Sequence, residues 1–205
     1  LRFSAEGSAP SRVVLSAAVI GALIGAVSLT GSIIAWAKLD GVLDKRFTFP
    51  GQQYINLLVF LAAALAGAYL FLGLDVRVII AFFVLALLFG VMMTLPIGGA
   101  DMPVVISLFN AFTGLAVAFE GFVLQNEALI IAGMVVGAAG MLLTQLMAKA
   151  MNRPISGVLF SNFGGGGASA TEIKGSMRAI EPSDAASMLY TTNSVIIVTG
   201  YGVAI

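Results

Sequence analysis

The sequence contains no cysteine and no histidine, and only 10% of its residues are charged. Without cysteine the chain can form no disulfide and offers no thiolate as a nucleophile or metal ligand. The lack of histidine removes the most common proton shuttle and metal ligand. Any proton transfer must therefore use carboxylates, amides, hydroxyls, Lys, Tyr or water. The formal net charge is zero, so nothing indicates a nucleic-acid partner.

What remains is strongly apolar. Hydrophobic residues make up 60% of the 205 positions, and the mean hydropathy is +1.05. Soluble domains keep about a quarter of their residues charged, so this chain has too few charges to cover a surface that faces water. We therefore expect an integral membrane protein, for which the lipid bilayer is the solvent.

Five apolar segments are each close to the ~20 residues needed to cross a ~30 Å hydrocarbon core. They are continuously apolar rather than alternating, which favours helices over barrel strands. Short segments with Gly, Pro, Asp or Asn separate them. The sequence thus predicts an all-α membrane domain, a bundle of about five transmembrane helices at Val13–Ala37, Tyr54–Leu74, Val76–Leu95, Pro103–Leu124 and Ala128–Ala148.

Basic residues in the connecting segments indicate the orientation. One group lies between the first two spans and another follows the fifth span: Lys38, Lys45, Arg46, Lys149 and Arg153. Five spans put both groups on one side, and the positive-inside rule makes that side cytoplasmic. Arg2, Arg12 and Arg77 lie on the outer side and oppose this assignment weakly. Asp101 then lies in a cytoplasmic loop. It is either an ordinary loop residue, solvated or capping the next helix, or part of a switchable contact.

The composition changes after Arg153, where the glycine run Gly164–Gly167 indicates a flexible linker. We assign residues 1–153 to a transmembrane domain, 154–182 to a linker, and 183–205 to the truncated start of a soluble domain. The chain begins without Met and ends inside an apolar run. We therefore expect it to be a fragment of a longer protein.

The expected soluble domain carries two local signals. Ser183 is a candidate cap for a short helix that ends at Tyr190. Ser194–Val198 is a β-branched strand pattern, and Gly200-Tyr201-Gly202 follows it. In dinucleotide-binding folds such a turn lets the backbone approach a pyrophosphate. The alternative is an ordinary tight turn.

Polar side chains gather on one half of the fourth span. At about 100° per residue, Ser107, Asn110, Thr113 and Glu120 fall in the half that also carries small residues. Asn110 lies ~11 Å beyond Pro103, not far from the middle of the membrane, and Glu120 lies ~26 Å beyond it, near the outer interface. Asn110 either hydrogen-bonds to a neighbouring helix and so holds the two together, or is part of a proton path. Glu120 is either a solvated interface residue or a relay.

Glycine pairs in two spans match the small-xxx-small pattern that lets helices approach closely. Gly21 and Gly25 lie in the first span, and Gly133 and Gly137 lie in the fifth. Gly140 adds a close contact or a local hinge. The pattern is weak by itself because Gly and Ala are abundant throughout the chain.

Several segments, in order along nearly the whole chain, resemble the beta subunit of the proton-translocating NAD(P) transhydrogenase family. The loop and helix start at 97–105 carry the resemblance most strongly, together with Asn110 and the Thr113-Gly114 pair. Further matching segments are Thr30–Ser32, Lys38-Leu39, Lys149–Arg153 and Gly200–Ala204.

The resemblance implies that the chain takes part in proton translocation coupled to hydride transfer from NADH to NADP⁺. NADP would be bound by the α/β domain that begins near residue 194, and NAD by a partner, the alpha subunit. It also implies a dimer of alpha–beta units in a bacterial inner membrane. The residues it implicates are Ser107, Asn110, Thr113 and Glu120 for the proton path, Asp101, Gly137, Gly140, Lys149 and Arg153 for coupling, and Gly200, Tyr201, Gly202, Val203 and Ala204 for NADP.

The chain departs from the family pattern in three places. Many members carry a channel histidine on an earlier helix, and this chain has none. Thr199 stands where many members have proline, and Ala138 and Ala139 replace hydroxyl residues of some relatives. These departures concern the detailed proton relay and not the family resemblance. A solute transporter or channel subunit is the competing function, and a passive membrane anchor for a dehydrogenase is a third.

Overall fold

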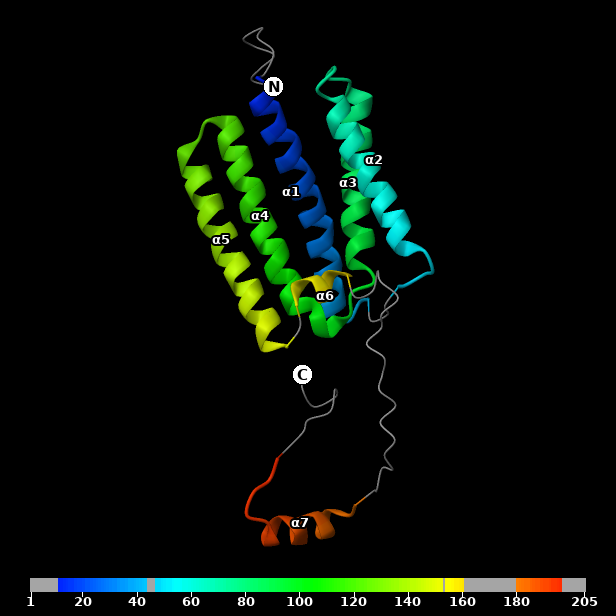
Figure 1. Ribbon diagram of the computed structural model, residues 1–205, viewed down its shortest axis with the longest axis vertical. Coiled ribbons are helices and arrows are strands. Elements are labelled where there is room, and N and C mark those ends of the chain that lie inside the picture. Colours follow the sequence, from blue (N-terminus) through cyan, green and yellow to red (C-terminus); the bar gives the residue numbers. More distant parts are fainter. Residues whose placement is uncertain (1–10, 44–46, 153, 161–179, 197–205) are drawn as a thin grey trace. The chain divides into compact units, whose positions relative to one another are not determined.

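A computed structural model describes residues 11–43, 47–152, 154–160 and 180–196 (Figure 1). Within those ranges all regular secondary structure is helical and no strand occurs. The chain divides into two compact units, residues 1–167 and 168–205, which we describe separately.

The first unit contains five helices that are long and apolar enough to cross a membrane. The predicted number of spans is thereby confirmed. Their limits differ from the prediction by a few residues. The largest difference is in the second helix, which was predicted to end at Leu74 but ends at Tyr69 and is followed by a non-helical turn. The helices are α1 (Arg12–Leu39), α2 (Gln52–Tyr69), α3 (Val76–Thr94), α4 (Met102–Leu124) and α5 (Glu127–Ala150).

Side-chain caps explain why three of the spans begin where they do. Ser11 accepts a hydrogen bond from the amide of Val14 at the start of α1, at 3.3 Å. Asp75 caps α3 in the same way, and Asn126 caps α5. Each cap satisfies one of the amides that a helix leaves unpaired at its N-terminus.

The five spans form a row rather than a closed bundle. The order of neighbours is α5, α4, α1, α3 and α2, and Figure 1 shows α1 in the centre, between α4 and α3. A single row leaves two broad faces without helical cover, and many large apolar side chains are exposed on them. Such faces suit lipid tails or further transmembrane helices.

Glycines allow the closest helix contacts. A Cβ added to Gly133 of α5 would lie 2.4 Å from the backbone nitrogen of Ala118 in α4. On α1, a Cβ at Gly21 would lie 2.9 Å from Cβ of Phe119. Real Cβ atoms do not approach so closely, so these positions let the helices pack backbone against backbone. One glycine of each predicted pair therefore makes an unusually close contact, whereas Gly25 and Gly137 have ordinary contact distances of 3.6 and 3.5 Å.

One end of the row is closed by a short helix that the sequence analysis missed. We call it the Asp101 end; there α1, α3 and α5 finish and α2 and α4 begin. Helix α6 (Ile155–Phe160) packs against α4 and α5. Its Val158 is fully buried in one apolar cluster with Ile97, Met102 and Ala148. The segment assigned to the linker therefore includes a helix that belongs to the membrane unit.

The second unit contains α7 (Pro182–Thr191), which corresponds to the predicted short helix. Its N-cap is Glu181 rather than Ser183, so the predicted cap is wrong. Ser183 lies inside the helix, where its carbonyl accepts a hydrogen bond from Ser187. Residues 194–196 form no strand, and residues 197–205 lie outside the described part. The described residues therefore contain no α/β domain.

Candidate functional site

Three polar side chains of α4 lie on one exposed stripe. Asn110, Thr113 and Glu120 are all exposed, and their spacing places them on one face of the helix. We call this set the polar stripe. Two apolar residues share this face: Ile106 precedes Asn110, and Val117 lies between Thr113 and Glu120. In lipid, such polar groups would be costly unless they face water or a partner helix.

A groove runs along the row beside the polar stripe. Its volume is about 930 Å³, and α1, α3 and α4 line it. The small residues Gly21, Ala22 and Gly25 of α1 leave it open, and Thr113 and Glu120 line it from α4. The groove therefore gives two members of the polar stripe access to a volume that water or another helix can occupy.

Hydrogen bonds join α1 to the polar stripe. Ser28 of α1 is buried, and its Oγ lies 2.7 Å from Oγ1 of Thr113 and 2.9 Å from the carbonyl oxygen of Phe109. The hydroxyl of Thr113 in turn donates to the same carbonyl at 2.9 Å. The two hydroxyls thus form a connected pair between α1 and α4, next to the groove. Sequence analysis did not single out Ser28.

Ser107 does not share the surface of the polar stripe. It is buried between α4 and α5, and its hydroxyl donates to the carbonyl oxygen of Gly140 at 3.2 Å. Thr144 lies 3.1 Å from Ser107 Oγ and donates to Gly140 at 2.7 Å. The predicted polar half of the helix is therefore two surfaces, one packed against α5 and one exposed.

The two glycines of α5 that were expected to take part in coupling differ in how tightly they pack. A Cβ on Gly140 would lie 2.9 Å from backbone atoms of Ala111. On Gly137 it would lie 3.5 Å from its nearest neighbours, which is an ordinary contact. Gly140 is thus a close-contact position within a continuous helix, and the hinge that was its alternative is not seen.

Asp101 is not the solvated loop residue that was one of its two predicted readings. It lies in the short 3-10 helix η1 (Gly99–Asp101), is only 3% exposed, and occupies the N-cap position of α4. Its side chain makes no capping hydrogen bond there. Lys149 is exposed at the end of α5, and Arg153 lies outside the described residues.

Lys38 is the polar residue that sequence reasoning placed least well. It was expected in a basic segment beside the membrane, but it is 8% exposed at the end of α1. Its ammonium group donates to the carbonyl oxygens of Thr94 (3.2 Å), Leu95 and Ile97 (2.6 Å). Sequence reasoning could not predict that Lys38 is buried, because its burial depends on the packing of α1 against α3.

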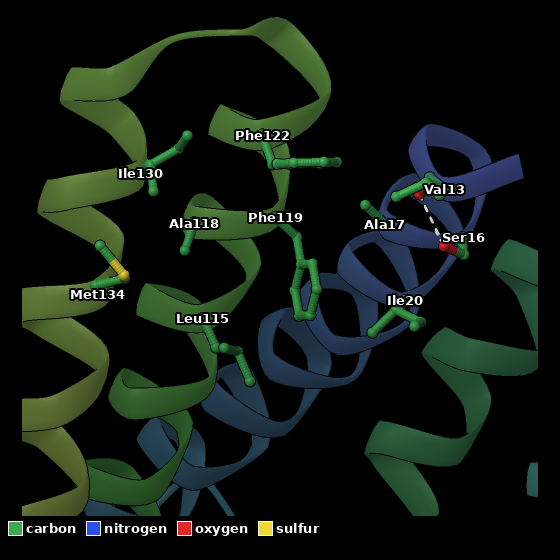
Figure 2. A pocket seen from close by; sticks show the side chains of 10 residues that line it. All are labelled: Val13, Ser16, Ala17, Ile20, Leu115, Ala118, Phe119, Phe122, Ile130 and Met134. Carbon is green, nitrogen blue, oxygen red and sulfur yellow. Dashed lines mark hydrogen bonds between the residues drawn. The ribbon is translucent and has the colours of Figure 1, made fainter. Parts of the chain in front are cut away.

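A second hollow, of about 360 Å³, lies between α1, α4 and α5 (Figure 2). Its lining is apolar except for Ser16, whose hydroxyl donates to the carbonyl of Val13 in its own helix. Figure 2 shows Phe119, Phe122 and Met134 lining it. This hollow has the chemistry of a lipid or helix contact and offers no polar group for a solute.

The proposed nucleotide-binding residues 200–204 lie outside the described part of the chain. The described geometry brings together the polar stripe and the Asp101 end on one helix, α4.

The sequence matches a family of known proteins over almost its whole length. The family described as "NAD(P) transhydrogenase beta subunit" matches residues 3–205. Two relatives, both named NAD(P) transhydrogenase subunit beta and both from Rhodospirillum rubrum, are each 41% identical over 191 residues. The match covers 91% of this chain and 41% of each relative, so the chain spans less than half of their length. The chain belongs to the NAD(P) transhydrogenase beta subunit family.

Proposed function

We propose that this chain forms part of the proton path of an enzyme that couples hydride transfer from NADH to NADP⁺ to inward proton movement. In this proposal NAD binds to an alpha subunit, NADP binds to a domain that begins near residue 194, and two alpha–beta units form a dimer. The membrane is a bacterial inner membrane, with the Asp101 end on the cytoplasmic side.

One observation carries the proposal: the polar stripe is exposed at membrane depth. Asn110 lies about two turns into α4, ~12 Å from its start. Thr113 and Glu120 continue the same face toward the other end, where the groove opens beside them. Polar side chains at such depth usually mark an ion or proton pathway or a helix contact. Together with the family, the stripe supports a proton path.

The proposed mechanism needs two states of this path. A pump must open a site to one side of the membrane and then to the other, and nucleotide occupancy must bias that equilibrium. The nicotinamide cofactors supply the hydride chemistry. In this chain, Asn110 and the Thr113–Ser28 pair would hydrogen-bond water along the path, and Asp101 and Lys149 at the Asp101 end would respond to the nucleotide domain.

A solute transporter or channel subunit is the alternative. Such transporters build their sites from helices that are broken near mid-membrane. The described spans are continuous, and the non-glycine residues with positive φ, Gln125 and Asn152, lie at helix ends. A passive membrane anchor needs only apolar helices, so that function would not account for the polar stripe. Both observations favour the proton path.

The proposal predicts that Asn110→Leu assembles in the membrane but abolishes most proton movement coupled to transhydrogenation. The reason is that leucine keeps the number and branching of the side-chain heavy atoms but cannot hydrogen-bond water in the path. The measurement is the pH change in vesicles that contain the complete alpha–beta enzyme. Ile106→Leu, an apolar change on the same face of α4, is the control and should pump normally. Normal pumping by Asn110→Leu would show that Asn110 only joins helices.

A further inference from the structure

The C-terminal end of α3 is held by side chains from two other helices. A helix leaves its last carbonyl groups without partners inside the helix. Here Gln52 and Asn56 of α2 donate to the carbonyl of Met92, at 3.4 and 3.3 Å. Lys38 of α1 donates to three further carbonyls, one at the last residue of α3 and two in the connection to α4.

The ammonium group of Lys38 suits this position. It has three N–H donors, and three carbonyl oxygens receive them. A cation is also favoured at a helix C-terminus, where the helix dipole is negative. Burying an ammonium group is costly unless it is well hydrogen-bonded. If Lys38 lost these contacts, its buried ammonium group would destabilise the fold.

The contacts reach the segment that starts α4. Ile97, whose carbonyl accepts at 2.6 Å, is fully buried in the apolar cluster with Met102 and Val158. Asp101 follows at the N-cap of α4. Lys38 therefore fastens the α3–α4 connection to α1, and the same connection packs against α6, which leads toward residues 161–205 of the chain.

We propose that Lys38 is a positioning residue for proton coupling: it holds the α3–α4 connection, and with it Asp101 and the start of α4, in register with α1. This inference rests on the proposed function. A movement of the nucleotide domain would be transmitted to α4 through this connection only if the connection is held at its α1 side. Without Lys38, hydride transfer would continue while fewer protons accompany it.

The test uses Lys38→Met and Lys38→Arg in the complete alpha–beta enzyme in vesicles. Methionine keeps the stem but loses the donors, whereas arginine keeps charge and donors. Protons moved per hydride transferred should fall several-fold in Lys38→Met and recover in Lys38→Arg. Lys45→Met, which removes the next lysine in the sequence, serves as the control and should leave the ratio unchanged.

A second measurement follows the connection itself. Because this chain has no cysteine, Ile97→Cys adds one buried thiol to it, which reacts with a maleimide only when the connection opens; the enzyme without this substitution gives the background labelling. Its labelling rate should rise about tenfold or more in Lys38→Met, since losing one charge-assisted hydrogen bond shifts an opening equilibrium by that factor. Lys38→Arg should label slowly. If Lys38→Met does not assemble, Lys38→Gln, whose side chain is shorter and neutral, takes its place in both measurements.

The outcomes separate this inference from the proposed function. An unsubstituted enzyme that moves no protons would contradict the proposed function itself. If that enzyme pumps, unchanged coupling in Lys38→Met overturns the positioning role, whatever the labelling shows. Lost coupling with unchanged labelling also overturns it, because the connection would then not be what Lys38 holds. Lost coupling with faster labelling, and recovery of both in Lys38→Arg, supports it.

Discussion

At the scale of single residues, one turn of α4 separates two kinds of polar side chain. Ser107 is buried against α5 and satisfied by the backbone of Gly140, whereas Asn110, about 60° away around the helix, is exposed. Sequence reasoning identified both as polar residues of one half of the helix. It could not separate them, because the separation depends on which side of α4 receives α5.

Asp101 is the residue for which burial changes the expectation most. As a buried carboxylate at the start of α4, it has more influence on the helix than a solvated charge would have. We predict that Asp101→Asn leaves the enzyme assembled but weakens the pH dependence of NADPH release, because the substitution removes the buried carboxylate at the start of α4 from the coupling segment. The check is the NADPH dissociation rate against pH for both enzymes. Superimposable curves would mean that Asp101 has no part in the switch.

At the scale of elements, the packing of α4 on α5 depends on glycines that differ in how much room they leave for an added methyl group. Gly133 meets the backbone of Ala118 and Gly114 so closely that a methyl group cannot fit, whereas Gly137 leaves ordinary contact distance. The two positions are one turn apart in the same helix. Sequence patterning predicted that both mediate packing but could not rank them, since the ranking depends on the crossing point of the two backbones.

This ranking leads to a matched pair of substitutions. Gly133→Ala should lower the free energy of unfolding by about 1–3 kcal/mol, because the added methyl overpacks the contact. Gly137→Ala should leave it nearly unchanged, since its Cβ has room. Equilibrium unfolding of the purified protein in mixed detergent micelles measures both. Equal losses in the two variants would show that the helices do not cross as described.

At the scale of the whole membrane unit, the predictable part is the number of spans. Length and apolar composition alone indicated five, because a bilayer imposes a minimum length on any helix that crosses it. The row arrangement, the short helix α6 and the burial of Lys38 were not predictable. Each depends on contacts between segments distant in the sequence, such as Lys38 with Ile97, for which a single sequence carries no local signal.

The row also explains why the candidate site has the polar stripe beside an open groove. Because the spans lie in a row, one face of α4 borders the groove that α1, α3 and α4 line, and Thr113 and Glu120 are exposed there. In the proposed function, water reaches this groove and nucleotide occupancy changes its access.

The most direct measurement is the reactivity of Thr113→Cys in the complete alpha–beta enzyme, with the unsubstituted enzyme as background. Cysteine is close to threonine in size, and the chain has no other thiol. We predict that a small, charged, water-soluble thiol reagent modifies this position from one side of the membrane, at a rate that changes when NADP⁺ is exchanged for NADPH. A thiol that reacts only with lipid-soluble reagents, at the same rate with either nucleotide, would contradict it.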